Sequence, residues 1–273
     1  MFWFKKKKIV LDCFTADPFV YEYASIQPSV KYYPEWWTNL PLTVERDVLR
    51  EWGLFKDKVI KSDFTTMKAC RGLTGLYKNS FVIPFWGNLE FFIKNKDQKA
   101  YYWQDDFTKK LGTADKSVSF HPQLQYSGWV SDEYVHAKLI SPWSLKTNRF
   151  VQFALVEPTW NKRELNDYTT LPGVLDFKYQ HGININLMLK LESVERNLLF
   201  EVGTPMAHII PLSEENIELK NHLVSVDDFC RLMPSERINY KGLISSKKYS
   251  RVRSFLQKHE ERNKPKCPFG FGK

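Results

Sequence analysis

Asp176 and Tyr179 are the two residues of this sequence whose types and spacing best suit chemistry. A Pro-Gly turn precedes them, and residues 183–187 then alternate between apolar and polar side chains, as a half-buried strand does. A carboxylate at such a place can orient or deprotonate a water molecule, and a tyrosine ring offers a flat wall to a sugar. The alternative role of Asp176 is structural, because Asp often forms turns or caps strands.

Three further side chains are candidates for binding a ligand. Gln180 and His181 follow Tyr179 directly, and His208 lies in a second marked segment, residues 200–212. The strands that carry His181 and His208 could bring the two rings face to face. The competing interpretation for both is a hydrogen-bonded structural histidine.

The two segments resemble two linked signatures of the dUTPase and dCTP-deaminase superfamily. The first signature, Gly-Val/Leu-Ile-Asp-x-x-Tyr-x-Gly before an alternating strand, matches the stretch from Gly173 to Tyr179. The second, Gly-Asp-x-Ile-Ala-Gln after a hairpin, corresponds to Gly203-Thr-Pro-Met-Ala-His208. The resemblance implies a distorted β-barrel or sandwich, in which Asp176 positions water, Tyr179 packs on a deoxyribose and Mg²⁺ neutralises the phosphates. It also implies a homotrimer, since active dUTPases build their sites between subunits.

The sequence departs from that family where phosphate is bound. The Arg-Ser-Gly loop has no counterpart, because Ser141-Pro-Trp-Ser144 lies near the expected place without Arg or Gly. The match therefore favours the fold over the activity. Other stretches, including Tyr32-Tyr-Pro-Glu-Trp-Trp37, are similar to uncharacterised proteins of tailed phages, particularly marine and cyanobacterial ones. That similarity implies a viral origin and brings no established activity.

Other catalytic chemistries have weaker signals. A β-barrel could house an iron-dependent oxygenase, which needs two His and one carboxylate on one metal. Glu133-x-x-His136 is present, but such a spacing alone is common by chance. The chain also has no phosphate-binding P-loop and no nucleophile-elbow motif.

Composition and charge indicate a folded, basic protein. The net charge of +9 is concentrated at residues 5–8 and 247–266 and suits either a polyanionic partner or solvated tails. Four cysteines have neither zinc-site nor redox-pair spacing. The apolar start precedes its positive charges, unlike a signal peptide, and no apolar run is long enough to cross a bilayer, so we expect a cytosolic protein.

Short β-rich runs separated by turn residues predict a mainly β fold with minor α content. We expect strands at residues 9–14, 80–85, 89–93, 100–104, 135–140, 150–156, 183–191, 198–202 and 206–210. Trp86-Gly87-Asn88 is expected to form a tight hairpin turn. A short helix is predicted within residues 64–77, with Asp63 as its candidate cap. Further helices are predicted at residues 226–233 and, as a basic amphipathic helix, at 246–262.

Three regions are expected along the chain. Residues 1–78 form an aromatic-rich extension, residues 79–222 the β core, and residues 223–273 a basic helical segment. Prolines within residues 21–42 exclude a long helix or central strand there. The Tyr and Trp side chains of that stretch are expected to pack on the body, or alternatively to offer a stacking surface to bases or sugars.

Two hypotheses of function remain open. In the first, a non-catalytic β-fold protein serves a phage as a virion component or as a binder of a host protein. In the second, the protein binds a deoxynucleotide or another phosphate ligand, and hydrolyses it as a dUTPase-like pyrophosphohydrolase with Mg²⁺. The missing phosphate loop favours the first, since a fold can outlast its site. Either role places the protein in the host cytoplasm or in the virion.

Overall fold

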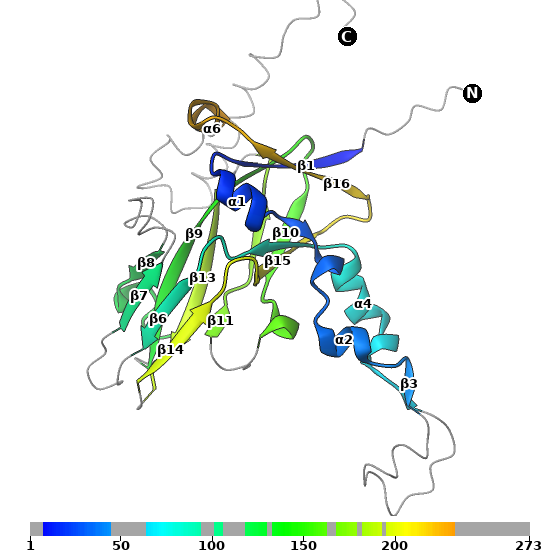
Figure 1. Ribbon diagram of the computed structural model, residues 1–273, viewed down its shortest axis with the longest axis horizontal. Coiled ribbons are helices and arrows are strands. Elements are labelled where there is room, and N and C mark those ends of the chain that lie inside the picture. Colours follow the sequence, from blue (N-terminus) through cyan, green and yellow to red (C-terminus); the bar gives the residue numbers. More distant parts are fainter. Residues whose placement is uncertain are drawn as a thin grey trace, which may run out of the picture.

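The computed structural model describes residues 8–44, 64–93, 101–105, 118–129, 133–162, 168–178, 182–192 and 195–232 (Figure 1). This part of the chain is mainly β, as the sequence predicts. The strands are β1 (Ile9–Thr15), β2 (Gln27–Pro28), β3 (Thr43–Val44), β4 (Phe64–Thr65), β5 (Phe81–Pro84), β6 (Leu89–Ile93), β7 (Tyr101–Asp105), β8 (Val118–His121), β9 (Tyr134–Thr147), β10 (Gln152–Val156), β11 (Tyr168–Thr170), β12 (Gly173–Asp176), β13 (Gly182–Lys190), β14 (Arg196–Phe200), β15 (Pro205–Pro211) and β16 (Ile217–Leu223). The helices are α1 (Pro18–Tyr23), α2 (Glu35–Asn39), α4 (Arg71–Lys78) and α6 (Val226–Leu232), with 3-10 turns η1 (Ser29–Tyr32), η2 (Met67–Ala69), η4 (Gln123–Gln125) and η5 (Thr159–Asn161).

The largest sheet has six strands in the order β11-β13-β9-β1-β16, with β8 also paired to β9. β1 lies between β9, to which it is antiparallel, and β16, to which it is parallel. Alternate side chains of β1 point inward, and Ile9, Leu11 and Cys13 are buried. The N-terminal strand is therefore an interior part of the main sheet, and the strand pairing does not follow the expected boundary at residue 78.

The remaining large sheets meet at a corner. A five-stranded sheet, β12-β10-β15-β5-β2, adjoins a three-stranded sheet, β14-β6-β7, because both β5–β6 and β14–β15 continue from one sheet into the other. At the bend, the Phe85 N–H donates to the Thr204 carbonyl at 2.8 Å, and the Gly203 N–H donates to the Phe85 carbonyl at 2.8 Å. Gly203 has a φ of +83°, a conformation that favours glycine.

The prediction of a hairpin turn at Trp86-Gly87-Asn88 is wrong. β5 pairs with β15 and β2, whereas β6 pairs with β14 and β7, so these residues carry the chain between two sheets. Trp86 is only 2% exposed, and burial of so large a ring in the core opposes its placement in an exposed turn. The hairpin that does form at this place joins β6 to β7.

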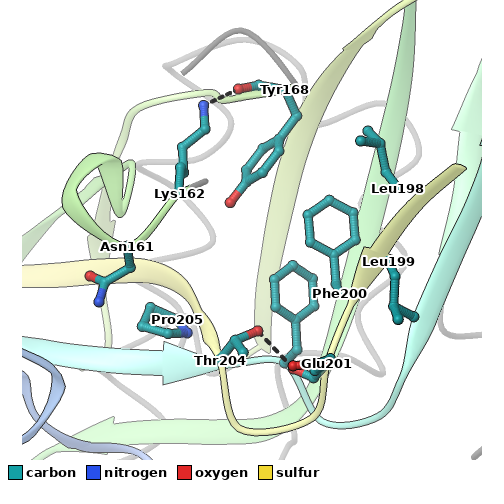
Figure 2. Close-up of a pocket in the computed structure, with 10 residues that line it drawn as sticks. Asn161, Lys162, Tyr168, Leu198, Leu199, Phe200, Glu201, Thr204 and Pro205 are labelled. Carbon is teal, nitrogen blue, oxygen red and sulfur yellow. Dashed lines mark hydrogen bonds between the residues drawn. The ribbon is translucent and has the colours of Figure 1, made fainter. Parts of the chain in front are cut away.

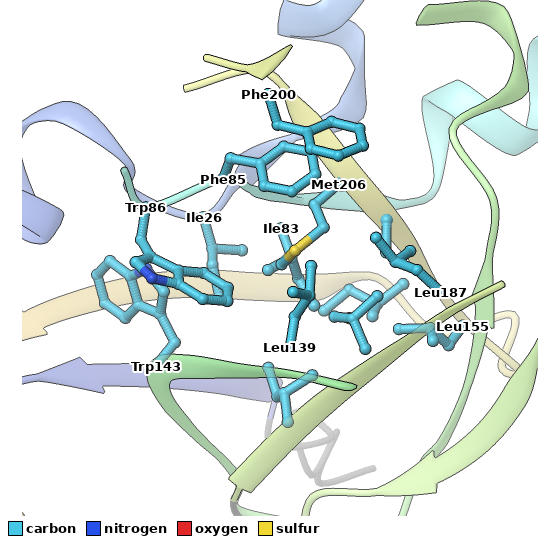
Figure 3. Packing of buried hydrophobic residues seen from close by; sticks show 14 of the residues in the cluster. Ile26, Ile83, Phe85, Trp86, Leu139, Trp143, Leu155, Leu187, Phe200 and Met206 are labelled. Atoms are coloured by element: carbon cyan, nitrogen blue, oxygen red, sulfur yellow. The ribbon is translucent and has the colours of Figure 1, made fainter. Parts of the chain in front are cut away.

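Side chains on the inward faces of these sheets form the hydrophobic core (Figure 3). Its members include Trp86, Trp143 and Met206, each at most 2% exposed. The Trp143 Nε1–H donates to the Ala24 carbonyl at 3.0 Å, which satisfies the indole inside the core.

Within the described residues no sheet closes into a barrel, so the expected barrel is wrong. The edges β11, β16, β12, β2, β14 and β7 each pair on one side within their sheets. A closed barrel would need two of these edges to pair with each other. Similarity to the dUTPase fold thus stays a hypothesis.

The helices match the expectations in part. α6 agrees with the predicted helix at residues 226–233, and α4 agrees with the short helix predicted within residues 64–77, although it ends one residue later, at Lys78. The residues before α4 form β4 and η2. Asp63 and the predicted helix at 246–262 lie outside the described residues. None of the described helices is long and apolar enough to cross a membrane.

Candidate functional site

Asp176 is the last residue of β12 and is 7% exposed. Its Oδ1 accepts a hydrogen bond from the backbone N–H of Lys178 at 3.0 Å, which is the local contact of a turn-forming aspartate. Tyr179, Gln180 and His181 lie outside the described residues. The geometry around Asp176 therefore matches its structural interpretation.

His208, on β15, is buried in a hydrogen-bonded network. Its Nδ1 lies 3.0 Å from the Ser29 hydroxyl, and the Ser80 hydroxyl donates to Ser29 at 2.7 Å. The rings of His208 and Tyr77 meet edge to face, with their centroids 5.0 Å apart. Burial lowers the pKa of His208 to about 4, so the ring is neutral at pH 7.

The structure does not bring Asp176 and His208 together. On the shared neighbour β10, Asp176 lies opposite Gln152 and His208 lies opposite Val156. At about 3.3 Å per residue, the two positions are about 13 Å apart along the sheet. Asp176 and His208, which lie in the two segments compared with the dUTPase signatures, therefore do not share one site.

The aromatic residues of the N-terminal part form a packed cluster. Tyr33, Trp37, Tyr77 and Trp160 contact one another with ring centroids 4.3 to 6.0 Å apart. Their faces are thus largely taken up by each other, which supports packing on the body over a stacking surface for bases or sugars. Trp36 is the large exposed ring of this cluster, at 44%, and its Nε1–H donates to the Trp160 carbonyl at 3.1 Å.

A pocket of about 170 Å³ lies beside the corner between the sheets (Figure 2). Its apolar lining comes mainly from Phe85, Leu198, Leu199, Phe200 and Pro205. Polar groups at its margin come from Asn161, Lys162, Glu201 and Thr204, and the Tyr168 ring points toward its interior. Polar and apolar groups thus line the pocket in nearly equal shares, and a ligand-binding site usually combines the two.

One strand edge beside this pocket is occupied by side chains. Glu157 Oε1 accepts from the Thr170 N–H at 2.8 Å and pairs with Lys162 Nζ at 3.2 Å. Lys162 Nζ also donates to the Tyr168 carbonyl and lies 4.3 Å from the centre of the Tyr168 ring. The Glu157–Lys162 pair thus supplies backbone partners along the β11 edge that a further strand would otherwise provide.

The other edge beside the pocket, β14, pairs with β6 and is the end of its sheet. Side chains alternate along it, with Asn197 and Leu199 exposed and Phe200 buried. Leu199 is 58% exposed and lines the pocket at the same time. An edge strand beside a pocket with an apolar wall is the geometry that receives an extended peptide.

The described residues contain no group of three or more His, Cys, Asp or Glu side chains that could hold a metal ion. The described part of the chain therefore supplies no two-His, one-carboxylate site.

The comparisons with known proteins give no relative for the chain. No family model, no curated protein and no solved structure matches it. The resemblances to dUTPases and to phage proteins have no support from these comparisons.

The sequence did not reveal the pocket, because the pocket depends on how distant strands meet. Its residues come from β5, η5, β11, β14 and β15. Two signals were available in retrospect: the Gly-Thr-Pro sequence at 203–205 marks the bend, and the pair of leucines at 198–199 places an apolar side chain on each face of a strand.

Proposed function

We propose that this is a non-catalytic binding protein that captures an extended, apolar segment of a partner protein along β14. The carrying observation is the asymmetry of the two edges beside the pocket. The Glu157–Lys162 pair occupies the β11 edge, whereas β14 presents Leu199 next to the apolar wall of the pocket. In strand addition, backbone hydrogen bonds supply affinity and a side-chain pocket supplies selectivity.

The size and lining of the pocket support an aliphatic or single-ring side chain as its occupant. A cavity of 150 Å³ lined by apolar residues accommodates benzene in another protein, and this pocket has about 170 Å³. Phe85 and Phe200 stack with centroids 4.5 Å apart and form an apolar wall. Thr204 and Asn161 lie at the margin, where they can bond the peptide backbone of the partner.

The partner belongs to one of two sources under this proposal, a virion or a host protein. The viral origin expected from the sequence motivates both, and under this proposal the protein acts in the host cytoplasm or in the virion. Selection from a displayed random-peptide library finds the binding motif whichever source the partner has. We expect wild-type protein to enrich peptides with apolar residues at alternate positions, because alternate side chains of a strand face one side.

The test is a comparison of two leucine variants. Leu199→Lys places a charge at the pocket and should abolish binding of the selected peptides. Leu223→Lys is the matched control, since Leu223 is 47% exposed at the end of another edge strand, β16. The proposal fails if no peptide is enriched, or if the two variants bind the selected peptides equally well.

The nucleotide alternative is a separate hypothesis with its own assay. It rests on the match between Gly173 and Tyr179 to the dUTPase signature. Turnover of a deoxynucleoside triphosphate with Mg²⁺, or a thermal shift with one, would favour it over peptide binding. The contact of Asp176 with the Lys178 N–H supports the structural role instead.

A further inference from the structure

His121 and His136 lie opposite each other on neighbouring strands of the six-stranded sheet. They are paired in the register of β8 and β9, and their rings stack with centroids 4.5 Å apart and an angle of 27° between planes. Val135 and Ala137 on either side of His136 are buried, so the two imidazoles lie on the face of the sheet that points away from the core. Strand pairing thus holds both rings in one place.

An amide oxygen holds one nitrogen of each ring. His136 Nε2 lies 3.1 Å from Asn186 Oδ1, and His121 Nδ1 contacts Gln125 Oε1. An amide oxygen can only accept, so each of these ring nitrogens donates its N–H. In the neutral rings, His121 Nε2 and His136 Nδ1 therefore carry the lone pairs.

This arrangement is the one that prepares histidines for metal binding. A metal-binding His usually donates its other N–H to a carbonyl or carboxylate, which fixes the tautomer and the orientation of the ring. Here two adjacent rings both have that support, from η4 on one side and β13 on the other. Tyr126 also packs against His136, with centroids 6.0 Å apart and planes at 81°.

We propose that His121 and His136 together bind one divalent first-row transition-metal ion, of the Zn²⁺, Ni²⁺ or Cu²⁺ type, with water completing its coordination. Imidazole suits these ions. Metal–nitrogen bonds of about 2.0–2.1 Å require the two nitrogens to come within about 4 Å of each other. The ring centroids are already 4.5 Å apart, so binding needs the two stacked rings to turn edge-on to the ion, with the Asn186 and Gln125 amides turning with them, and no movement of the strands.

The consequence for the fold is a link between β8 and β9 that does not involve the pocket. The site shares no residue with the lining of the pocket, so metal binding and peptide binding are separable. Because the metal needs deprotonated imidazoles, its affinity should fall as the pH is lowered.

Isothermal titration of the full chain with ZnCl₂ at pH 7.5 tests the proposal, with NiCl₂ and CuCl₂ as further probes. We expect one site whose affinity falls at least tenfold in His121→Gln and in His136→Gln. Asn186→Leu removes the acceptor behind His136 and should weaken the same site by roughly ten- to a hundredfold. His222→Gln is the matched control, since His222 is a half-exposed histidine of the same sheet that bonds Asp12 at 2.8 Å, and it should leave this site unchanged.

A second measurement separates loss of the site from loss of the fold. In ¹⁵N-resolved spectra of the histidine rings, Zn²⁺ should shift His121 Nε2 and His136 Nδ1 in the wild-type protein. Equal affinity in the wild-type, His121→Gln and His136→Gln proteins, or ring shifts confined to other histidines, would overturn the proposal. Absence of any saturable binding by the folded wild-type chain would overturn it as well.

Discussion

At the scale of single residues, His208 shows how burial decides the chemistry of a candidate ligand. Its pKa is lowered from 6.5 to about 4 by burial, so the unfolded chain binds the proton more tightly than the folded one. The stability that comes from keeping His208 neutral is complete above pH 6.5, falls as the pH drops toward 4, and changes no further below that. The difference corresponds to about 3 kcal/mol.

Urea unfolding between pH 7.5 and pH 4 measures this effect. We expect the wild-type protein to lose about 3 kcal/mol of unfolding free energy across the window through His208. His208→Gln should lose less over the same range, whatever its stability at pH 7.5. An unchanged slope in His208→Gln would show that this ring is not responsible.

Gly203 is required by backbone conformation as well as by space. Its φ is +83°, and a Cβ there would lie 3.3 Å from the Tyr23 carbonyl oxygen. We expect Gly203→Ala to destabilise the protein by about 1–2 kcal/mol, as read from the denaturant midpoint. The control is Gly75→Ala in α4, which has nothing within 4 Å of its Cβ and should gain about 0.5–1 kcal/mol from helix propensity.

Asp176 is expected to act through its turn. Asp176→Ala removes the acceptor of the Lys178 N–H and should lower the unfolding free energy by about 1 kcal/mol. In the same preparations, we expect no hydrolysis of any deoxynucleoside triphosphate by the wild-type protein with Mg²⁺. Wild-type turnover that Asp176→Ala abolishes at unchanged stability would establish the catalytic role instead.

At the scale of elements, the Glu157–Lys162 pair takes the place of a neighbouring strand. The Lys162 side chain is 1% exposed and bonds both Glu157 and the Tyr168 carbonyl. Removing one member of a buried pair leaves the other charge buried, so Lys162→Met should cost about 3 kcal/mol in thermal or urea unfolding. Replacing both, as Glu157→Gln with Lys162→Met, should cost less than the sum of the two single changes.

The same replacement should change how β11 behaves. In Lys162→Met the carbonyl of Tyr168 becomes available to another chain, and Glu157, which accepts from the Thr170 N–H, loses its charged partner. We expect Lys162→Met to increase self-association, which light scattering can follow at temperatures below its own unfolding transition. Lys190→Met, at an exposed ion pair 3.8 Å from Glu192, is the control and should remain as monodisperse as the wild type.

Periodicity predicted most strands but not their partners. The runs at 9–14, 89–93 and 183–191 agree with β1, β6 and β13 because one face of each is strongly apolar. β16 escaped detection since its alternation, Ile-Glu-Leu-Lys-Asn-His-Leu, is half-exposed and its partner β1 lies about 200 residues away in the sequence. The prediction for Trp86 was wrong because the Gly87-Asn88 pair that follows it is typical of a turn, whereas the indole ring is buried in the core.

At the scale of the whole molecule, the pocket could not be predicted because it depends on contacts that no local pattern carries. The bend at Gly203 brings β14 and β15 past β5 and β6, and η5 then closes the other side. Burial of Phe85 and Phe200 at that bend links the core to the candidate binding site. The histidine pair on β8 and β9 was likewise hidden, since His121 and His136 meet only through strand register.

The pairing of the first and last described strands predicts that the molecule folds as one unit. β1 lies between β9 and β16, and its Ile9, Leu11 and Cys13 are each at most 2% exposed. Burial of a large apolar side chain contributes about 2 kcal/mol to stability. Losing these side chains therefore removes a substantial part of the unfolding free energy of a typical domain, which is roughly 5–15 kcal/mol. A fragment of residues 79–222, the expected β core, should therefore show no cooperative thermal transition, whereas residues 1–232 should unfold cooperatively. Circular dichroism and calorimetry of the two fragments measure this. A cooperative transition in the shorter fragment would support the predicted division into three regions.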